Sequence, residues 1–325
     1  MLKKVGIFLL SLSLLLIGVI ACSGASSGKV VTIGISQLVE HPALDSAREG
    51  FIEALKEAGY EDGKNIKIDY QNAQGDVNNA QTIARKFADE KVDMILAIAT
   101  QAAQAAANVT KDIPILITAV TDPVSAGLAE SLDKPGGNVT GTTDINPVDE
   151  QIKLVKELVP DAERLGILYN SGEINSKVQV EMAKEIVGEL GLTLVEAAVS
   201  NSNEVSQATQ SLMGRVDAIY VPTDNTIVSS IGAVIKIANE NKIPVIGSER
   251  GQVDAGAIAT KGIDYRELGK QTGAIAVEVL KGKKPQDIPI EKAKNVTLIV
   301  NKKAAETIGL TISEDMLAEA EEVIE

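Results

Sequence analysis

Residues 75–98 read GDVNNAQTIARKFADEKVDMILAI, and residues 202–221 read SNEVSQATQSLMGRVDAIYV. In each segment an amphipathic helical stretch leads through a Val-Asp pair into a run of aliphatic residues, which is typical of a helix followed by a buried strand. Each segment is followed by a helical stretch and by an Ile-Pro that opens a further strand, at Ile113-Pro114 and Ile243-Pro244. The repetition predicts two lobes of one architecture, although common βαβ patterns could produce part of the likeness without common ancestry.

The same alternation of short β-branched runs and longer amphipathic stretches extends over the rest of the chain. Strands are expected at 31–35, 66–70, 94–98, 115–118, 139–142, 165–169, 193–199, 218–221, 245–246 and 296–300. Helices are expected at 45–58, 77–90, 177–190, 204–213 and 265–280, and a terminal helix is expected at 313–325. The predicted fold class is therefore α/β, with two doubly wound parallel-sheet lobes joined by a multi-strand hinge.

The order of the expected elements also predicts the domain boundaries. The N-terminal lobe is expected at residues 30–144, with a return segment at about 262–282, and the C-terminal lobe at residues 145–261. Residues from about 296 to 325 are expected to supply a hinge crossing and the tail. The hinge is expected because a helix and a strand remain after the second lobe is complete, and crossing back would place them against both lobes.

The N-terminus predicts export and a lipid anchor. Lys3 and Lys4 precede an uncharged, largely apolar run that ends at Cys22, the chain's only cysteine. Residues 1–21 therefore read as a lipoprotein signal peptide, and residues 22–29 as the lipidated cysteine and a flexible tether. The alternative is an N-terminal membrane span. On the first interpretation the mature protein is lipid-anchored on the extracytoplasmic face of the cell membrane and has no disulfide.

Composition and charge argue against several functions. Removal of residues 1–21 would change the net charge from −14 to −16, and the chain has no Trp, so nucleic-acid binding is not expected. His41 is the only histidine, which leaves no Ser-His-Asp relay except through it, and we expect it to be a solvated or cleft-rim residue. The glycines at 136–137 lack the Lys-Ser/Thr ending of a phosphate loop. The sequence therefore predicts no enzyme, no metal site and no cofactor.

Polar residues follow most of the predicted strands. In open parallel sheets, ligands bind beyond the carboxyl ends of the strands, so residues at these positions from two facing lobes would meet in one cleft. Any single one of them could instead cap a helix or form a turn. The candidate ligand-binding residues are Ser36, Gln37, Thr100, Gln101, Thr121, Asp122, Asn170, Ser171, Asp224 and Asn225.

A small zwitterion suits such a cleft, and the predicted ligand is an apolar or aromatic amino acid. Its ammonium needs a carboxylate, for which Asp224 is the first candidate, although Asp224 could instead cap the helix near Thr226. Its carboxylate needs the hydroxyl and backbone N–H groups that Thr100, Thr121 and Ser171 could provide. Sugar binding is the nearest alternative, but it commonly relies on stacking aromatic rings, and the chain has few.

Several segments resemble the ABC-transporter substrate-binding family that includes tryptophan- and tyrosine-type binding lipoproteins. The segments are residues 34–45 (GISQLVEHPALD), 117–124 (ITAVTDPV), 135–141 (PGGNVTG), 221–225 (VPTDN) and 262–265 (GIDY). The resemblance implies a type I periplasmic-binding fold, hinge closure on a ligand, no enzymatic activity, and ABC permease and ATPase subunits as partners. It also implies an aromatic amino acid as ligand. We expect the protein to be a monomer. The alternative function is that of a sensory ligand-binding subunit, or of a binding protein for a sugar or nucleoside.

Overall fold

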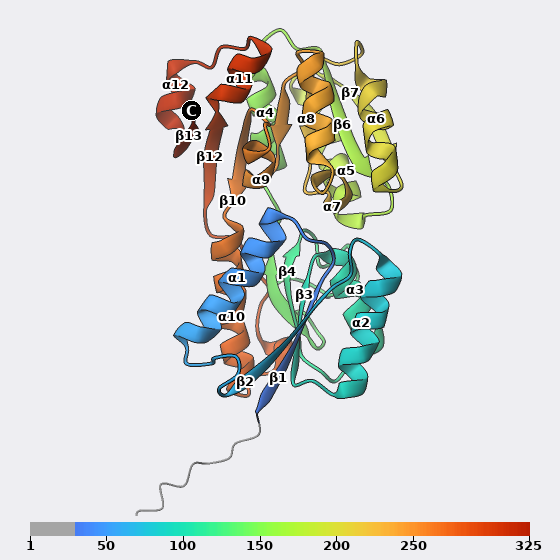
Figure 1. Ribbon diagram of the computed structural model, residues 1–325, viewed down its shortest axis with the longest axis vertical. Coiled ribbons are helices and arrows are strands. Elements are labelled where there is room, and N and C mark those ends of the chain that lie inside the picture. Colours follow the sequence, from blue (N-terminus) through green and yellow to red (C-terminus); the bar gives the residue numbers. More distant parts are fainter. Residues whose placement is uncertain (1–29) are drawn as a thin grey trace, which may run out of the picture. The chain divides into compact units, whose positions relative to one another are not determined.

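The computed structural model describes residues 30–325, and residues 31–325 form one compact unit that contains two lobes (Figure 1). The predicted signal peptide, Cys22 and the tether lie outside the described residues. The first lobe contains a parallel six-stranded sheet of order β11-β5-β4-β3-β1-β2. Its strands are β1 (Val31–Gln37), β2 (Ile66–Asn72), β3 (Met94–Ile98), β4 (Ile115–Val120), β5 (Val139–Thr143) and β11 (Glu291–Lys292). Its helices are α1 (Pro42–Glu57), α2 (Val77–Glu90), α3 (Thr100–Val109) and α10 (Tyr265–Leu280).

The second lobe contains a seven-stranded sheet of order β13-β12-β10-β9-β8-β6-β7, in which only the β10–β12 pairing is antiparallel. Its strands are β6 (Arg164–Asn170), β7 (Thr193–Val199), β8 (Ala218–Val221), β9 (Val245–Gly247), β10 (Ala259–Ile263), β12 (Val296–Asn301) and β13 (Glu322–Ile324). Its helices are α4 (Val148–Leu158), α5 (Ile174–Glu189), α6 (Val205–Leu212), α7 (Asn225–Val228), α8 (Ile231–Glu240), α9 (Arg250–Asp254), α11 (Lys302–Ile308) and α12 (Glu314–Glu319).

The apolar runs of the central strands are explained by burial on both sheet faces. In β3, Met94, Leu96 and Ile98 pack into one hydrophobic cluster, while Ile95 and Ala97 pack into the cluster on the opposite face. Successive side chains of a strand point to opposite faces, so helices on both sides require an almost continuous apolar run. The α/β fold class predicted from the sequence is thereby confirmed.

The chain passes between the lobes three times. We call residues 144–147, between β5 and α4, the first crossing. The second crossing is Asp264, between β10 and α10, and the third crossing is residues 293–295, between β11 and β12. A hydrogen bond of 2.7 Å from the Tyr265 hydroxyl to Asp144 Oδ2 joins the first residue of α10, directly after the second crossing, to the first crossing. Because these three segments are short, rotation about a few backbone dihedrals would move one lobe relative to the other. Together they form a multi-strand hinge.

Helix α10 returns from the second crossing to pack closely on α1 (Figure 1). Glycines make this contact possible: a Cβ on Gly50 would lie 2.0 Å from the carbonyl oxygen of Arg266, and a Cβ on Gly269 would lie 2.0 Å from that of Ala47. The two backbones therefore touch, and the late segment α10 completes the core of the first lobe.

Several helix boundaries differ from those expected, including those of α1, α5 and α12. Helix α1 begins at Pro42 rather than at residue 45, because proline is well tolerated in the first turn of a helix. The expectation of a terminal helix to residue 325 is wrong at its end. Helix α12 stops at Glu319, and Glu322–Ile324 form β13, which pairs in parallel with the edge of β12. The β-branched Val323 and Ile324 suit that strand.

Candidate functional site

Side chains from both lobes meet at a small cavity between the carboxyl ends of the two sheets. The lining residues lie at or after the carboxyl ends of β1, β4 and β5 in the first lobe and of β6, β8, β9 and β10 in the second. They are His41, Ala43, Leu44, Ala119, Thr121, Asp144, Asn175, Thr223, Asp224, Asn225, Val228, Glu249 and Tyr265. The cavity encloses about 20 Å³, room for little more than one water molecule. An organic ligand therefore requires the lobes to move apart before it can enter.

Asp144 is the carboxylate with spare hydrogen-bonding capacity in this cavity. Its side chain belongs to the first crossing and is 3% exposed. Oδ2 accepts the hydrogen bond from Tyr265, while Oδ1 is buried and has no hydrogen-bond partner. Burial raises the pKa of the Asp144 carboxyl, and the neighbouring hydroxyls of Tyr265 and Thr121 offset part of this rise. A cationic partner at Oδ1 would remove the cost of the buried charge.

Asp224 lines the same cavity, but the structure already uses both of its oxygens. Oδ1 accepts from the Ile227 N–H at 2.9 Å and so caps α7, while Oδ2 accepts from the Asn170 N–H and the Ser176 hydroxyl, each at 2.6 Å. Burial, followed by the charge of the nearby Glu173, raises the pKa of Asp224. The capping role considered from the sequence is therefore present. The assignment of Asp224 as the partner of a ligand ammonium group stays a prediction, and the geometry favours Asp144 for that role.

Glu249 is a third carboxylate at the cavity and caps the short helix α9. Its oxygens accept from the N–H groups of Gly251 at 2.6 Å and Gln252 at 2.9 Å. Burial raises the pKa of Glu249 to about 7. None of the thirteen lining residues is Lys or Arg, so the cavity favours a positively charged group over a negative one.

Two buried hydroxyls without partners lie at the carboxyl edge of the first sheet. Ser36 ends β1, and Thr100 begins α3; both are at most 1% exposed, and neither side-chain oxygen has a hydrogen-bond partner. Ala99, which precedes α3, has φ 79° and ψ 155° and provides no side-chain cap. This backbone conformation is rare for residues other than glycine, and it leaves the first N–H groups of α3 for an anionic group.

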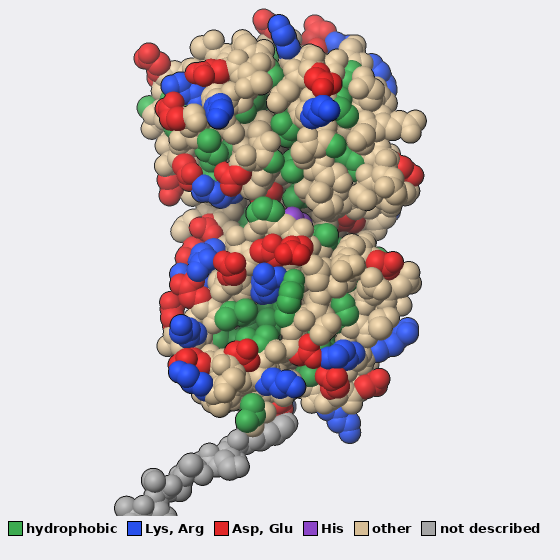
Figure 2. Space-filling view, viewed as in Figure 1, with side chains coloured by type: hydrophobic (Ala, Val, Ile, Leu, Met, Phe, Trp, Pro, Cys, Tyr) green, Lys and Arg blue, Asp and Glu red, His purple; other side chains and the backbone are tan. Residues whose placement is uncertain are grey.

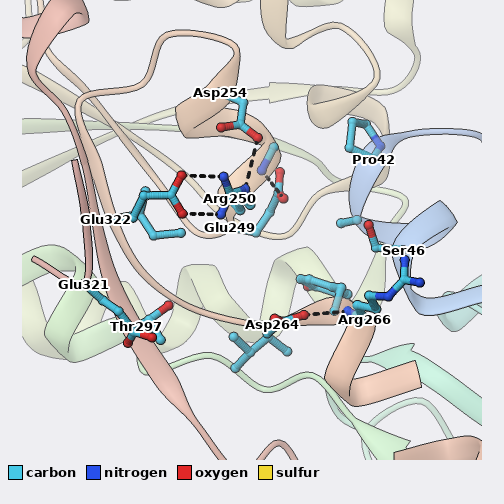
Figure 3. A pocket seen from close by; sticks show the side chains of 15 residues that line it. Pro42, Ser46, Glu249, Arg250, Asp254, Asp264, Arg266, Thr297, Glu321 and Glu322 are labelled. Carbon is cyan, nitrogen blue, oxygen red and sulfur yellow. Dashed lines mark hydrogen bonds and ion pairs between the residues drawn. The ribbon is translucent and has the colours of Figure 1, made fainter. Parts of the chain in front are cut away.

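Two larger depressions adjoin the cavity. One, of about 400 Å³, is lined by residues of both lobes, including Gln101, Asn170 and Asn225. The other, of about 450 Å³, lies beside the second crossing (Figure 3). Its Arg250 is already paired with both Glu322 and Asp254. We therefore place the ligand site at the smaller cavity, where buried polar atoms lack partners.

The ten residues predicted from the sequence are distributed unevenly. Thr121, Asp224 and Asn225 line the cavity, Gln101 and Asn170 line the adjacent depression, and Ser36 and Thr100 are buried at the sheet edge. The others, Gln37, Asp122 and Ser171, line neither space, and their side chains bond locally.

The ten residues predicted from the sequence do not include Asp144, Asn175, Tyr265 and Glu249, which line the cavity. Asp144 follows a predicted strand, so the strand-end rule could have found it, although its position at the predicted lobe boundary indicated a connection between the lobes. Glu249 satisfies the same rule. Asn175 lies in the first turn of α5, where a polar residue resembles an ordinary helix start.

Other kinds of site are not evident in the described part of the chain. Within residues 30–325 there is no group of three or more His, Cys, Asp or Glu residues that could hold a metal ion. None of the helices in that range is both long and apolar enough to cross a bilayer. On the face shown in Figure 2, Lys and Arg are interspersed with Asp and Glu and form no continuous basic surface.

Two α/β lobes, three crossings and a polar cavity between the sheets define a two-lobed binding protein of the periplasmic type I fold. A glucose-galactose binding protein from Geobacillus stearothermophilus and a solute binding protein from Bacillus halodurans C-125 with bound myo-inositol share this fold, at 17% and 19% identity and with TM-scores of 0.62 and 0.63. Residues 32–324 match the family described as ABC transporter substrate binding protein, and the chain belongs to that family. Such proteins bind small molecules outside the cytoplasm and work with a transporter.

Three relatives are informative about ligands. A tyrosine-binding protein from Clostridioides difficile (strain R20291) is 53% identical over 87% of this chain and 82% of its own. A Streptococcus pneumonia ABC domain in complex with L-Trp is 41% identical, with a TM-score of 0.88 over 90% of this chain and 99% of that one. A ligand-free, open substrate binding protein from Clostridium difficile is 49% identical, with a TM-score of 0.70 over 91% and 99%.

Proposed function

We propose that this protein binds an aromatic amino acid between its lobes and delivers it to the permease and ATPase subunits of an ABC importer. The observation that carries the proposal is the buried, unpartnered Oδ1 of Asp144 in a cavity that has no Lys or Arg in its lining. The ligand ammonium would pair with this oxygen. The tyrosine- and L-Trp-binding relatives support an aromatic side chain.

The ligand carboxylate would bind at the edge of the first sheet. The hydroxyls of Ser36 and Thr100 and the uncapped N–H groups at the start of α3 are the donors for it. In this arrangement Thr100 keeps the role predicted from the sequence, and Asp144 replaces Asp224 as the partner of the ligand ammonium.

Binding would be coupled to lobe closure. The structure is more similar to the L-Trp complex than to the open, ligand-free relative, although the open relative has the higher sequence identity. This difference supports a hinge motion between an open form that admits the ligand and a more closed form in which the lobes meet around it.

The cellular setting follows from the N-terminus. We propose that residues 1–21 are removed, that Cys22 carries the lipid, and that the mature protein acts as an extracytoplasmic carrier without enzymatic activity. A membrane-bound carrier stays near its permease, and residues 23–29 would give it the reach to dock.

A thermal-shift screen of residues 23–325 against the twenty amino acids tests the proposed function. A ligand at a hundred times its dissociation constant stabilises the folded protein by about 2.7 kcal/mol. We expect a rise in the melting temperature with L-tyrosine or L-tryptophan. A rise with a sugar or a nucleoside, and with no amino acid, would refute the proposal.

A further inference from the structure

We propose that His41 Nδ1, Asp144 Oδ1 and Asn175 Oδ1 form a three-acceptor cage for a primary ammonium group, so that the protein rejects N-methylated forms of its ligand. This inference rests on the proposed function and specifies the chemistry of its amine subsite.

The three atoms share two properties. Each is buried and lacks a hydrogen-bond partner, and each belongs to a residue that lines the cavity between the lobes. The exposed fractions of the three side chains are 9% for His41 and 3% for both Asp144 and Asn175. Buried polar atoms without partners are rare in folded proteins and require an explanation such as a missing ligand.

The amide orientation of Asn175 is determined by its neighbours. Its Nδ2 donates to Glu173 Oε2 at 3.1 Å and to the Thr223 carbonyl oxygen at 3.0 Å. A carboxylate and a carbonyl oxygen only accept hydrogen bonds. The free atom of Asn175 is therefore Oδ1, an acceptor.

The position of the proton on His41 follows from the hydrogen bonds of Asn225 and Glu173, two residues of the second lobe. Asn225 Nδ2 donates to Glu173 Oε2 at 2.7 Å, which leaves Asn225 Oδ1 to lie 3.4 Å from His41 Nε2. Nε2 must then carry the proton that it donates to this oxygen. Burial lowers the pKa of the His41 imidazole, so the neutral ring presents the lone pair of Nδ1 as an acceptor.

Three acceptors match the three N–H groups of a primary ammonium ion. An N-methylated amine has one N–H fewer, so one acceptor would stay unpaired and would be opposed by a methyl group. Sites that hydrogen-bond a ligand group discriminate strongly against analogues that lack it, because the buried polar atoms of the site are then left without partners.

The cage is divided between the lobes. His41 and Asp144 belong to the first lobe and its crossing, while Asn175, Asn225 and Glu173 belong to the second. Only the closed arrangement brings the three acceptors together and orients the His41 ring. The ammonium group would therefore stabilise the closed form directly.

Calorimetric titration with L-tyrosine and N-methyl-L-tyrosine tests the cage. We expect wild-type protein to bind the methylated compound about 10-fold or more weakly. In His41→Ala, which removes one acceptor and makes room for a methyl group, L-tyrosine should lose about 10-fold in affinity, and the penalty for methylation should fall below about 3-fold. Asn108→Ala, an exposed change on α3 that does not line the cavity, is the matched control and should alter neither value.

Nitrogen-15 spectra of the imidazole provide a second readout that does not depend on the variant. His41 is the chain's one histidine, so its ring resonances need no assignment. With L-tyrosine bound, we expect a protonated Nε2 and an Nδ1 lone pair that accepts a hydrogen bond. A protonated Nδ1, or equal binding of the two tyrosines by wild-type protein, would overturn the cage while leaving the proposed function intact. If no amino acid binds at all, the proposed function fails and the cage fails with it.

Discussion

Replacement of Asp144 by Asn should abolish tight binding without harming the fold. The substitution keeps the shape of the side chain and removes the charge that the ligand ammonium would neutralise. Removal of one partner from a buried charge pair costs about 2–5 kcal/mol of binding free energy. Since 1.4 kcal/mol corresponds to a factor of ten, the dissociation constant should rise by about 30-fold or more.

The stability of the ligand-free variant should change in the opposite direction. A carboxyl whose folded-state pKa is raised binds its proton more strongly in the folded than in the unfolded protein, so its contribution to stability falls as the pH rises above about 3.9. Burial raises the pKa of Asp144 in this way. At pH 7.5 the ligand-free Asp144→Asn protein should therefore be at least as stable as the wild type.

Calorimetry and urea unfolding of three Asp-to-Asn variants would separate these effects. Asp122→Asn is the matched control, because Asp122 also follows a strand but bonds only within its own turn, to Val124 and Ser125. We expect it to bind like the wild type. The reasoning is refuted if Asp144→Asn binds normally while Asp224→Asn loses affinity, which would place the ammonium at Asp224 as the sequence alone predicted.

Three further predictions concern packing, pH and the anchor. Gly269→Ala should lower the free energy of unfolding by about 1–3 kcal/mol, because its Cβ would meet the α1 backbone. Gly188→Ala, whose Cβ would meet nothing within 4 Å, should not destabilise the protein. Urea unfolding of the two variants checks both expectations. The raised pKa of Glu249 predicts that the contribution of this group to the stability of the ligand-free protein falls by about 3 kcal/mol as the pH rises from 4 to 7. Glu249→Gln should therefore gain stability relative to the wild type over this range, measured by unfolding at fixed pH values, and the raised pKa of Asp224 acts in the same direction. A difference between the two proteins that does not change with pH would contradict this prediction. Cys22→Ala should release the protein from membranes, and mass spectrometry of the wild type should find a lipid on Cys22.

The fold could be predicted because its signals are local and repeated. The aliphatic runs of β3 and β8 need burial on both sheet faces, and each follows an amphipathic helix, so two copies of the pattern indicate two lobes. The end of the chain was harder, since a three-residue strand such as β13 depends on an available sheet edge, which the local sequence does not reveal.

The candidate site was less predictable because its key properties depend on tertiary contacts. The position of a residue after a strand does not distinguish Asp224, whose oxygens are occupied, from Asp144, which has one oxygen without a hydrogen-bond partner. The acceptor role of His41 depends on Glu173 through Asn225, a relay that joins residues far apart in the chain.

The small volume of the closed cavity has a consequence for measured affinity. Because a ligand cannot enter the closed form, only molecules in the open form are competent for association, and the apparent dissociation constant is the intrinsic one divided by their fraction. A substitution in a crossing segment that shifts the resting balance of the lobes would thus change affinity without touching the ligand. Relatives with identical cavity residues could on this account scavenge the same nutrient at different external concentrations.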